Sequence, residues 1–164
     1  MFSINSRRKF LKMGFLSSAV FVMSGCELFS ITTPVHTIRM VQNDLFPKAK
    51  ALNIETANYI TLILKSRYVS DEDKLFLKNG TKWLNETSVE MYKNIYTKLT
   101  YIERQNVLKE ISQTKWGDSW LYNMMNYIFE AMLGDPIYGG NNKEAGWKWL
   151  AFEGGKPRPT KAYV

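Results

Sequence analysis

The apolar pattern of residues 117–134 is the feature that most restricts the folds open to this chain of 164 residues. Apolar side chains recur there at the helical spacing i, i+3, i+4, i+7, i+8 and i+11, at Leu121, Met124, Met125, Ile128, Phe129 and Met132. Gly134 and Pro136 follow as residues that commonly end a helix. Such a stripe is typical of a core, although a Met-rich face can also bind partners. No stretch sustains strand-like alternation, so we predict an all-α fold.

Three further helices are indicated upstream, over residues 53–69, 70–99 and 100–115. Each begins with a side chain that can cap a helix, namely Asn53, Ser70 and Thr100, the last two with Asp73 and Glu103 three positions later. We therefore expect a small bundle of four to five helices. Because residues 134–155 contain six glycines, we expect an ordered glycine- and aromatic-rich loop at its C-terminal end.

Residues 1–25 have the order of a cleavable export signal: a basic segment, an apolar run of about 13 residues, and small residues. The run is shorter than the roughly 20 residues that cross a bilayer. The segment resembles a twin-arginine signal, which directs export of already folded proteins, through Arg7, Arg8, Phe10 and Leu11. An ordinary secretory signal with two arginines is the alternative. We expect a periplasmic protein, and folded export raises the question of which cofactor must be inserted first.

Cys26 directly follows the small residues Ser24 and Gly25, and this order resembles a lipoprotein processing site. If so, the cysteine carries lipid and anchors the protein; otherwise cleavage occurs nearby, and Cys26 is a free thiol or still part of the leader. Residues 26–36 are rich in Ser and Thr and are expected to be a tether. The helical domain is then residues 37–164.

Composition excludes several classes of function. A single cysteine and a single histidine, His36, leave no intramolecular disulfide, no thiolate cluster and no multi-histidine metal site. We expect His36 to be an ordinary surface or packing residue. The net charge of +7 comes partly from the leader, since residues 26–164 hold 18 basic and 15 acidic residues. No basic block with interleaved aromatics is present, so we expect no nucleic-acid binding.

The loop at residues 134–155 lacks the GxGxxG or GK[ST] patterns of phosphate-binding loops, and it follows a helix instead of a strand. A nucleotide site is therefore rejected. From its residues alone, the loop is an ordered cap that either packs on its own helices or is offered to a partner.

The order Asp135-Pro136, Tyr138-Gly139-Gly140-Asn141 and Gly146-Trp147 resembles the C-terminal signature of the gluconate 2-dehydrogenase subunit 3 family. The sequence DLFP at 44–47 is similar to the start of that family, and the resemblance covers roughly residues 35–155. Ala151-Phe152-Glu153 departs from the Gly-Phe-Pro that the family tends to have.

The resemblance implies a non-catalytic small subunit that binds no cofactor itself. Its partner would be a large GMC-type dehydrogenase that holds FAD, oxidises a sugar or sugar acid, and in some complexes passes electrons to a cytochrome c subunit. The small subunit would carry the signal to the twin-arginine translocase and escort the folded FAD subunit. The partner-binding residues are expected in the loop: Tyr138, Gly139, Gly140, Asn141, Trp147 and Trp149.

Two other functions stay open at this point. A stand-alone periplasmic lipoprotein would bind a ligand or an envelope partner. A small enzyme would need acid and base groups, for which Asp118, Asp135 and Glu144 are the candidates. For Trp147 the alternative to partner binding is that it folds back onto the Met-lined helix and closes the core.

Overall fold

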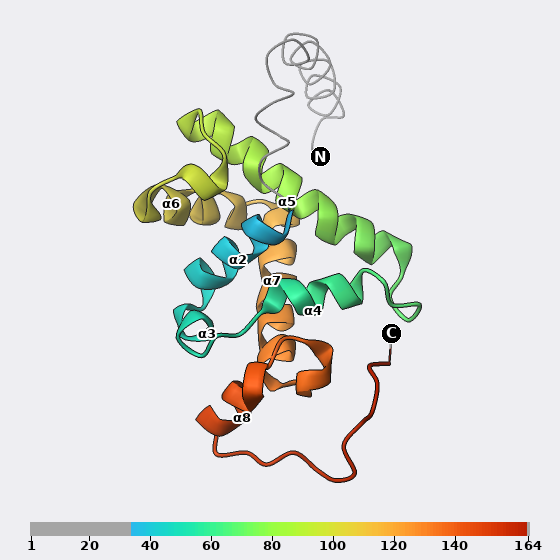
Figure 1. Cartoon of the computed structure of the whole chain (residues 1–164). Helices are drawn as coiled ribbons and strands as arrows, with labels where there is room; N and C mark the ends of the chain where they lie inside the picture. The colour runs from blue at the N-terminus through green and yellow to red at the C-terminus, as the bar shows by residue number, and fades with distance from the viewer. Residues whose placement is uncertain (1–33, 164) are drawn as a thin grey trace. The chain divides into compact units, whose positions relative to one another are not determined.

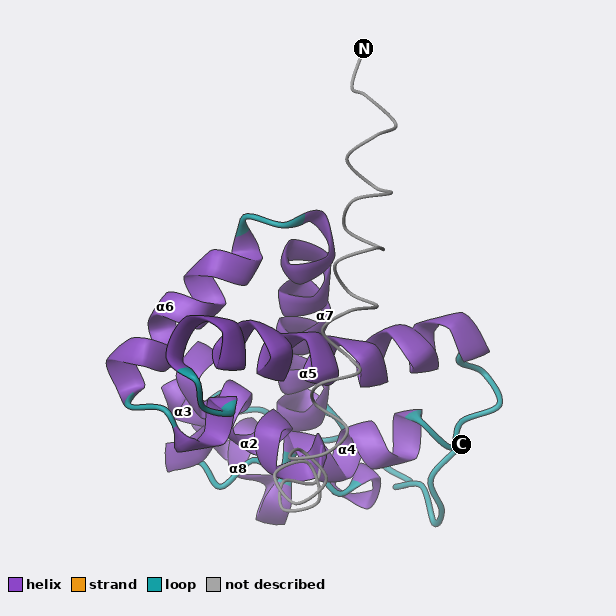
Figure 2. Ribbon diagram, turned by 90° about the horizontal axis from the view of Figure 1, so that it is seen from above, coloured by secondary structure: helices purple, strands orange, loops and turns teal. Residues whose placement is uncertain are grey.

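The computed structural model describes residues 34–163 (Figure 1). The predicted export residues Arg7, Arg8, Phe10 and Leu11 and the predicted lipid site Cys26 lie outside these residues. All regular structure within the described range is helical, so the all-α prediction is confirmed (Figure 2). In the described part of the chain no helix is both long enough and apolar enough to span a membrane.

The described residues form seven α-helices and three short 3-10 helices. The α-helices are α2 (Pro34–Leu45), α3 (Pro47–Ala51), α4 (Thr56–Ile63), α5 (Asp71–Tyr92), α6 (Tyr101–Ser112), α7 (Lys115–Leu133) and α8 (Ala145–Trp149). The 3-10 helices are η1 (Tyr96–Lys98), η2 (Pro136–Tyr138) and η3 (Asn142–Glu144). Five of the α-helices have eight or more residues; α3 and α8 have only five each, which is too short to produce a periodic signal.

Two of the three predicted N-caps are confirmed. The Ser70 hydroxyl accepts the Asp73 backbone N–H at the start of α5, and Thr100 and Glu103 form a reciprocal capping box at the start of α6. The backbone hydrogen bond from Thr100 lowers the pKa of the Glu103 carboxyl.

The prediction for Asn53 is wrong, because Asn53 lies in a left-handed turn with φ of 55° after α3 and α4 begins only at Thr56. The cap comes from another helix instead. The Gln42 side chain on α2 accepts the Thr56 backbone N–H at 3.0 Å and donates to the Ile54 carbonyl at 3.0 Å. A cap supplied across the fold leaves no local sequence signal.

Helix α7 runs through the middle of the helical body, with α2, α4, α5 and α6 packed around its N-terminal part (Figures 1 and 2). Trp120, fully buried, lies against α5 at Gly80, where an added Cβ would come within 2.0 Å of the indole ring. Met124, Ile128 and Met132 are buried, so the apolar stripe of α7 serves mainly as core.

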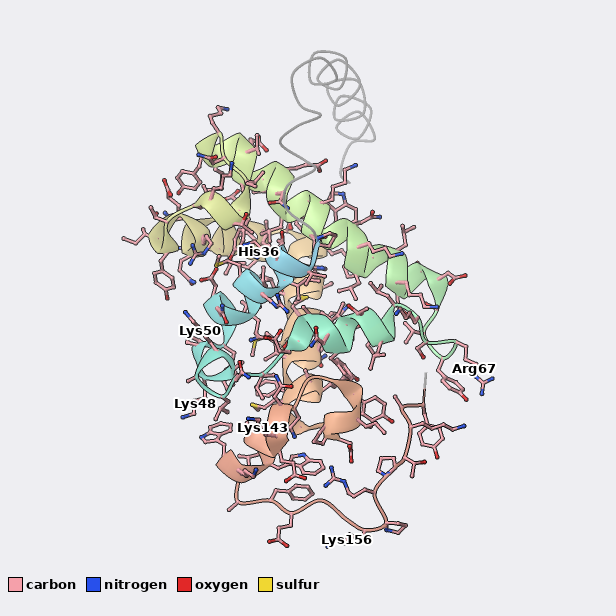
Figure 3. The ribbon with its side chains drawn as sticks, in the orientation of Figure 1. His36, Lys48, Lys50, Arg67, Lys143 and Lys156 are labelled. Carbon is pink, nitrogen blue, oxygen red and sulfur yellow. The ribbon has the colours of Figure 1, made fainter. Side chains whose placement is uncertain are left out.

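Helix α2 begins at Pro34, the proline occupying a position where a helix needs no backbone N–H. The last three residues of the expected tether are therefore helical. His36 is exposed in the first turn of α2 (Figure 3).

Candidate partner-binding site

Asn141 holds together the loop that follows α7. Its side-chain amide donates to the Gly134 carbonyl at 3.0 Å, and its side-chain oxygen accepts the Gly146 backbone N–H at 2.9 Å. Asn141 is fully buried, so its hydrogen bonds join the end of α7 to the start of α8 inside the protein.

The glycines of the loop are used for close packing. Gly139 has a φ of 77°, a conformation that favours glycine. A Cβ on Gly140 would lie 2.6 Å from the Ala131 carbonyl oxygen, and one on Gly146 would lie 2.0 Å from that of Met132. These two backbones rest directly on α7, so they do not form an open cradle that would fit a phosphate or a flavin.

Trp147 folds back onto the helix that precedes the loop. Only 7% of its surface is exposed, and its indole N–H donates to the Leu133 carbonyl of α7. The Arg158 guanidinium lies over the ring at 4.4 Å, and Phe152 meets the ring edge at 5.5 Å between centroids. Trp147 was expected either to bind a partner or to close the core, and its buried position is that of a residue that closes the core.

Arg158 also pairs with two of the carboxylates considered for acid–base chemistry. It donates to Asp135 at 2.8 Å and to Glu144 at 3.1 Å. The hydrogen bond from Arg158 lowers the pKa of the Asp135 carboxyl, which disfavours a role as general acid. Asp118 is exposed in the first turn of α7, whereas Asp135 follows the other end of that helix, which lies about 22 Å away along the helix axis. The structure therefore does not bring the three carboxylates into one site.

Tyr138 lines a shallow groove together with Tyr59, Glu130 and Gly134. The Tyr138 ring meets the edge of Tyr59 at 6.5 Å between centroids, and the Tyr59 hydroxyl donates to Glu130 at 3.0 Å. Burial, and then the charge of Glu130, raise the pKa of the Tyr59 hydroxyl, so it stays protonated. Tyr138 is half-buried and keeps part of its surface free.

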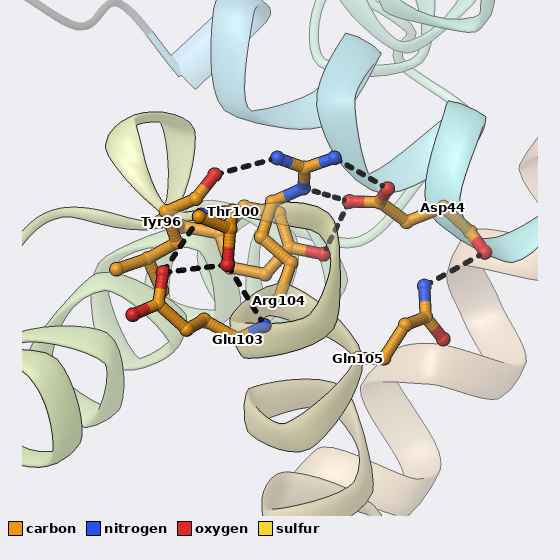
Figure 4. A network of polar contacts seen from close by, with 7 residues as sticks. Asp44, Tyr96, Thr100, Glu103, Arg104 and Gln105 are labelled. Carbon is orange, nitrogen blue, oxygen red and sulfur yellow. Dashed lines mark hydrogen bonds and ion pairs between the residues drawn. The ribbon is translucent and has the colours of Figure 1, made fainter.

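A buried ion pair fixes the DLFP segment at the end of α2 (Figure 4). Asp44 accepts two hydrogen bonds from Arg104 on α6, at 2.6 and 3.0 Å, and one from the Tyr96 hydroxyl at 2.8 Å. Burial and the Asp44 charge raise the pKa of Tyr96, and the hydrogen bond to Asp44 raises that of Arg104. The network anchors the chain two residues before Phe46.

Phe46 and Trp149 belong to a surface that we call the α8 patch. Phe46 lies 5.3 Å from Phe129 and 6.4 Å from Trp149 between ring centroids. Leu133 is one turn beyond Phe129 on α7, and Leu150 and Phe152 follow Trp149 in the chain. The α8 patch consists of six large apolar side chains: Phe46, Phe129, Leu133, Trp149, Leu150 and Phe152. Five of them are between 38% and 55% exposed, and Phe46 is partly exposed.

Four exposed lysines lie on the short helices next to the patch residues: Lys48 and Lys50 on α3, Lys143 on η3 and Lys148 on α8. Figure 3 labels the first three. The Lys48 ammonium lies 5.5 Å from the centre of the Trp149 ring, and Lys148 donates to the Lys143 carbonyl. Within residues 34–163, none of these four lysines has an ion-pair partner. An apolar patch with unpaired lysines beside it suits a partner surface that is apolar at its centre and acidic at its rim.

The residues predicted to bind a partner thus fall into two groups. Asn141, Gly140 and Trp147 are buried in the chain, whereas Trp149, Tyr138 and Gly139 keep exposed surface. Partner binding stays a prediction, and it applies most directly to the exposed group.

The sequence did not predict a binding role for five of the patch residues or for Arg158; the five are Phe46, Phe129, Leu133, Leu150 and Phe152. The sequence does distinguish two of them, since Phe46 belongs to the DLFP segment and Phe129 belongs to the apolar stripe of α7. Arg158 lies after the recognisable motif, in a segment without periodicity, and no local sequence pattern predicts its contact with Trp147.

Comparison with protein families supplies one more observation. The family model described as Gluconate 2-dehydrogenase subunit 3 matches residues 35–155 of the chain. No curated protein and no solved structure matches it. In the described range 34–163, no three side chains of His, Cys, Asp or Glu come together in a way that could hold a metal ion.

Proposed function

We propose a function for this chain from one premise: the chain belongs to the gluconate 2-dehydrogenase subunit 3 family. The family is named for one subunit of a multi-subunit dehydrogenase. The observation that carries the proposal is the extent of the match, since residues 35–155 include every described helix almost in full. The chain is accordingly an accessory subunit, and the proposal is that it contributes no catalytic group of its own.

The catalytic partner in this proposal is a large GMC-type flavoprotein, which holds FAD and oxidises gluconate or a related sugar acid. A cytochrome c subunit is the proposed next electron carrier. The packing of Gly140 and Gly146 on α7 supports the placement of FAD in the partner, because the one glycine-rich loop of this chain is filled by its own backbone contacts. The separation of Asp118 from Asp135 supports a non-catalytic role.

The second part of the proposal is export. The leader residues Arg7, Arg8, Phe10 and Leu11 would address the subunit to the twin-arginine translocase. FAD must be inserted while the large subunit folds in the cytoplasm, so a folded complex would cross the membrane on the signal of its small subunit. Cys26 would then hold the assembly at the periplasmic face through lipid.

The test is a double substitution, Arg7→Lys with Arg8→Lys, in the full chain expressed in its own host. We expect both this protein and the flavin-dependent gluconate dehydrogenase activity to stay in the cytoplasm after fractionation. Lys12→Gln, which removes a charge outside the arginine pair, is the matched control and should leave export unchanged. Normal dehydrogenase activity outside the cytoplasm in the double variant would refute the escort role.

A further inference from the structure

We propose that the α8 patch is the docking surface for the flavoprotein subunit, which enters it with an apolar projection flanked by carboxylates. The inference rests on the proposed function, and it adds the location and the chemistry of the contact. It moves the expected contact away from Trp147 and Asn141 to the C-terminal half of α7, the end of α8 with the residues after it, and Phe46 between α2 and α3.

The first support is the gathering of exposed apolar side chains at one place. Leu133, the last residue of α7, is 41% exposed, and Trp149, Leu150 and Phe152, at the end of α8 and just after it, are 43%, 50% and 55% exposed. Scattered exposed apolar residues are normal, whereas a contiguous group of them marks a surface that binds something. Aromatic residues of this kind carry much of the energy of protein interfaces.

The second support is the rigid attachment of the α8 patch. The ion pair of Asp44 with Arg104 anchors the segment that carries Phe46. Asn141 and Trp147 tie α8, and with it Trp149, to the end of α7. Rings already held in place lose little conformational entropy on binding, so their contact area is used efficiently.

The third support is charge, which identifies the kind of partner. Four exposed lysines, Lys48, Lys50, Lys143 and Lys148, lie on α3, η3 and α8, and the exposed acids next to patch residues in the chain are Glu130 and Glu153. Positive charge at the rim favours an acidic rim on the partner and raises the association rate. An anionic membrane would also match this charge. The exposed aromatic rings of Phe129, Trp149 and Phe152 favour a protein, because aromatic residues carry much of the energy of protein interfaces.

The experiment uses the full chain with an affinity tag after residue 164, purified mildly from its own host, with bound flavin measured per chain. We expect Leu150→Glu and Lys50→Glu each to lower the flavin carried per chain by at least about 10-fold, because they place acid in an apolar contact and reverse a rim charge. Leu75→Glu and Lys78→Glu on α5 are the matched controls, since both residues are exposed. They should carry as much flavin as the wild-type chain. Circular dichroism and thermal unfolding of each purified variant exclude misfolding as the cause.

The outcomes separate the two proposals. Wild-type chain that carries no flavin would overturn the proposed function and the docking surface with it. Wild-type and patch variants that carry equal flavin would leave the function standing and overturn the location. Loss of flavin in the α5 variants as well would also overturn the location. Binding of the wild-type chain, but not of Leu150→Glu, to vesicles containing phosphatidylglycerol, with flavin unchanged, would assign the patch to the membrane. Patch-dependent self-association with flavin unchanged would assign it to a second copy of the chain, and both results would contradict the proposal.

Discussion

The core around Trp120 and the loop after α7 are held together by different means. Around Trp120, helices of 8 to 22 residues bury apolar side chains against one another, and side-chain caps fix where α5, α6 and α7 begin. In the loop, five-residue α8 and two 3-10 helices are held by the hydrogen bonds of Asn141 and Trp147 and by the ion pairs and ring contact of Arg158. The core thus spreads its stability over many contacts, whereas the loop depends on a few.

This difference separates the loop residues that hold the fold from those that are free to bind. Asn141 and Trp147 make their side-chain hydrogen bonds within the chain. These bonds fix the position of α8 and so hold the α8 patch, which is made of other residues. The buried residues of a recognisable motif can therefore support an interface without contacting the partner themselves.

The largest effect is expected in the core. Trp120→Ala should lower the free energy of unfolding by about 3–5 kcal/mol, because the fully buried ring leaves a cavity between α5 and α7. Tyr122→Ala, two positions away and 68% exposed, should change it by less than about 0.5 kcal/mol. Chemical denaturation of both variants measures the difference. Equal effects would contradict the placement of Trp120 at the centre of the body.

A smaller loss is expected in the loop. Asn141→Ala should lower the free energy of unfolding by about 1–3 kcal/mol, since it leaves the Gly134 carbonyl and the Gly146 N–H without their partner. Asn142→Ala is the control, because the neighbouring Asn142 makes only an exposed side-chain hydrogen bond to the Asn53 carbonyl. Hydrogen exchange of α8 should accelerate in Asn141→Ala only. Unchanged protection of α8 would mean that Asn141 does not hold the loop.

These two regions also differ in how well the sequence predicts them. Long periodic segments and the capping pairs at Ser70 and Thr100 are local, so α5, α6 and α7 could be anticipated. The cap on α4 from Gln42 and the close approach of Gly80 to Trp120 join residues 14 and 40 positions apart, and no local pattern encodes them. The loop motif identified the family, but its spacing does not show that Trp147 is buried while Trp149 is exposed.

The smallest effect concerns pH. Arg158 lowers the pKa of Asp135 in the folded state, so their pairing stabilises the fold above the ordinary Asp pKa of about 3.9 and is lost as the pH falls through the lowered value. Wild-type protein should therefore be slightly more stable than Asp135→Asn at neutral pH, with the gap closing in acid. Unfolding curves from pH 7 down to about pH 3 measure it. A difference in the free energy of unfolding between the two proteins that grows in acid would contradict the pairing of Asp135 with Arg158.

The most direct test of the account compares two tryptophans that are two positions apart. Trp147→Ala and Trp149→Ala are each purified in the tagged full chain, and thermal unfolding and bound flavin per chain are measured. The account predicts that Trp147→Ala loses about 3–5 kcal/mol of stability, since the ring is 7% exposed. Trp149→Ala should lose less than about 1 kcal/mol but carry at least about 10-fold less flavin. If Trp149→Ala unfolds as readily as Trp147→Ala, or carries flavin like the wild type, the division between a buried support and an exposed binding surface is contradicted.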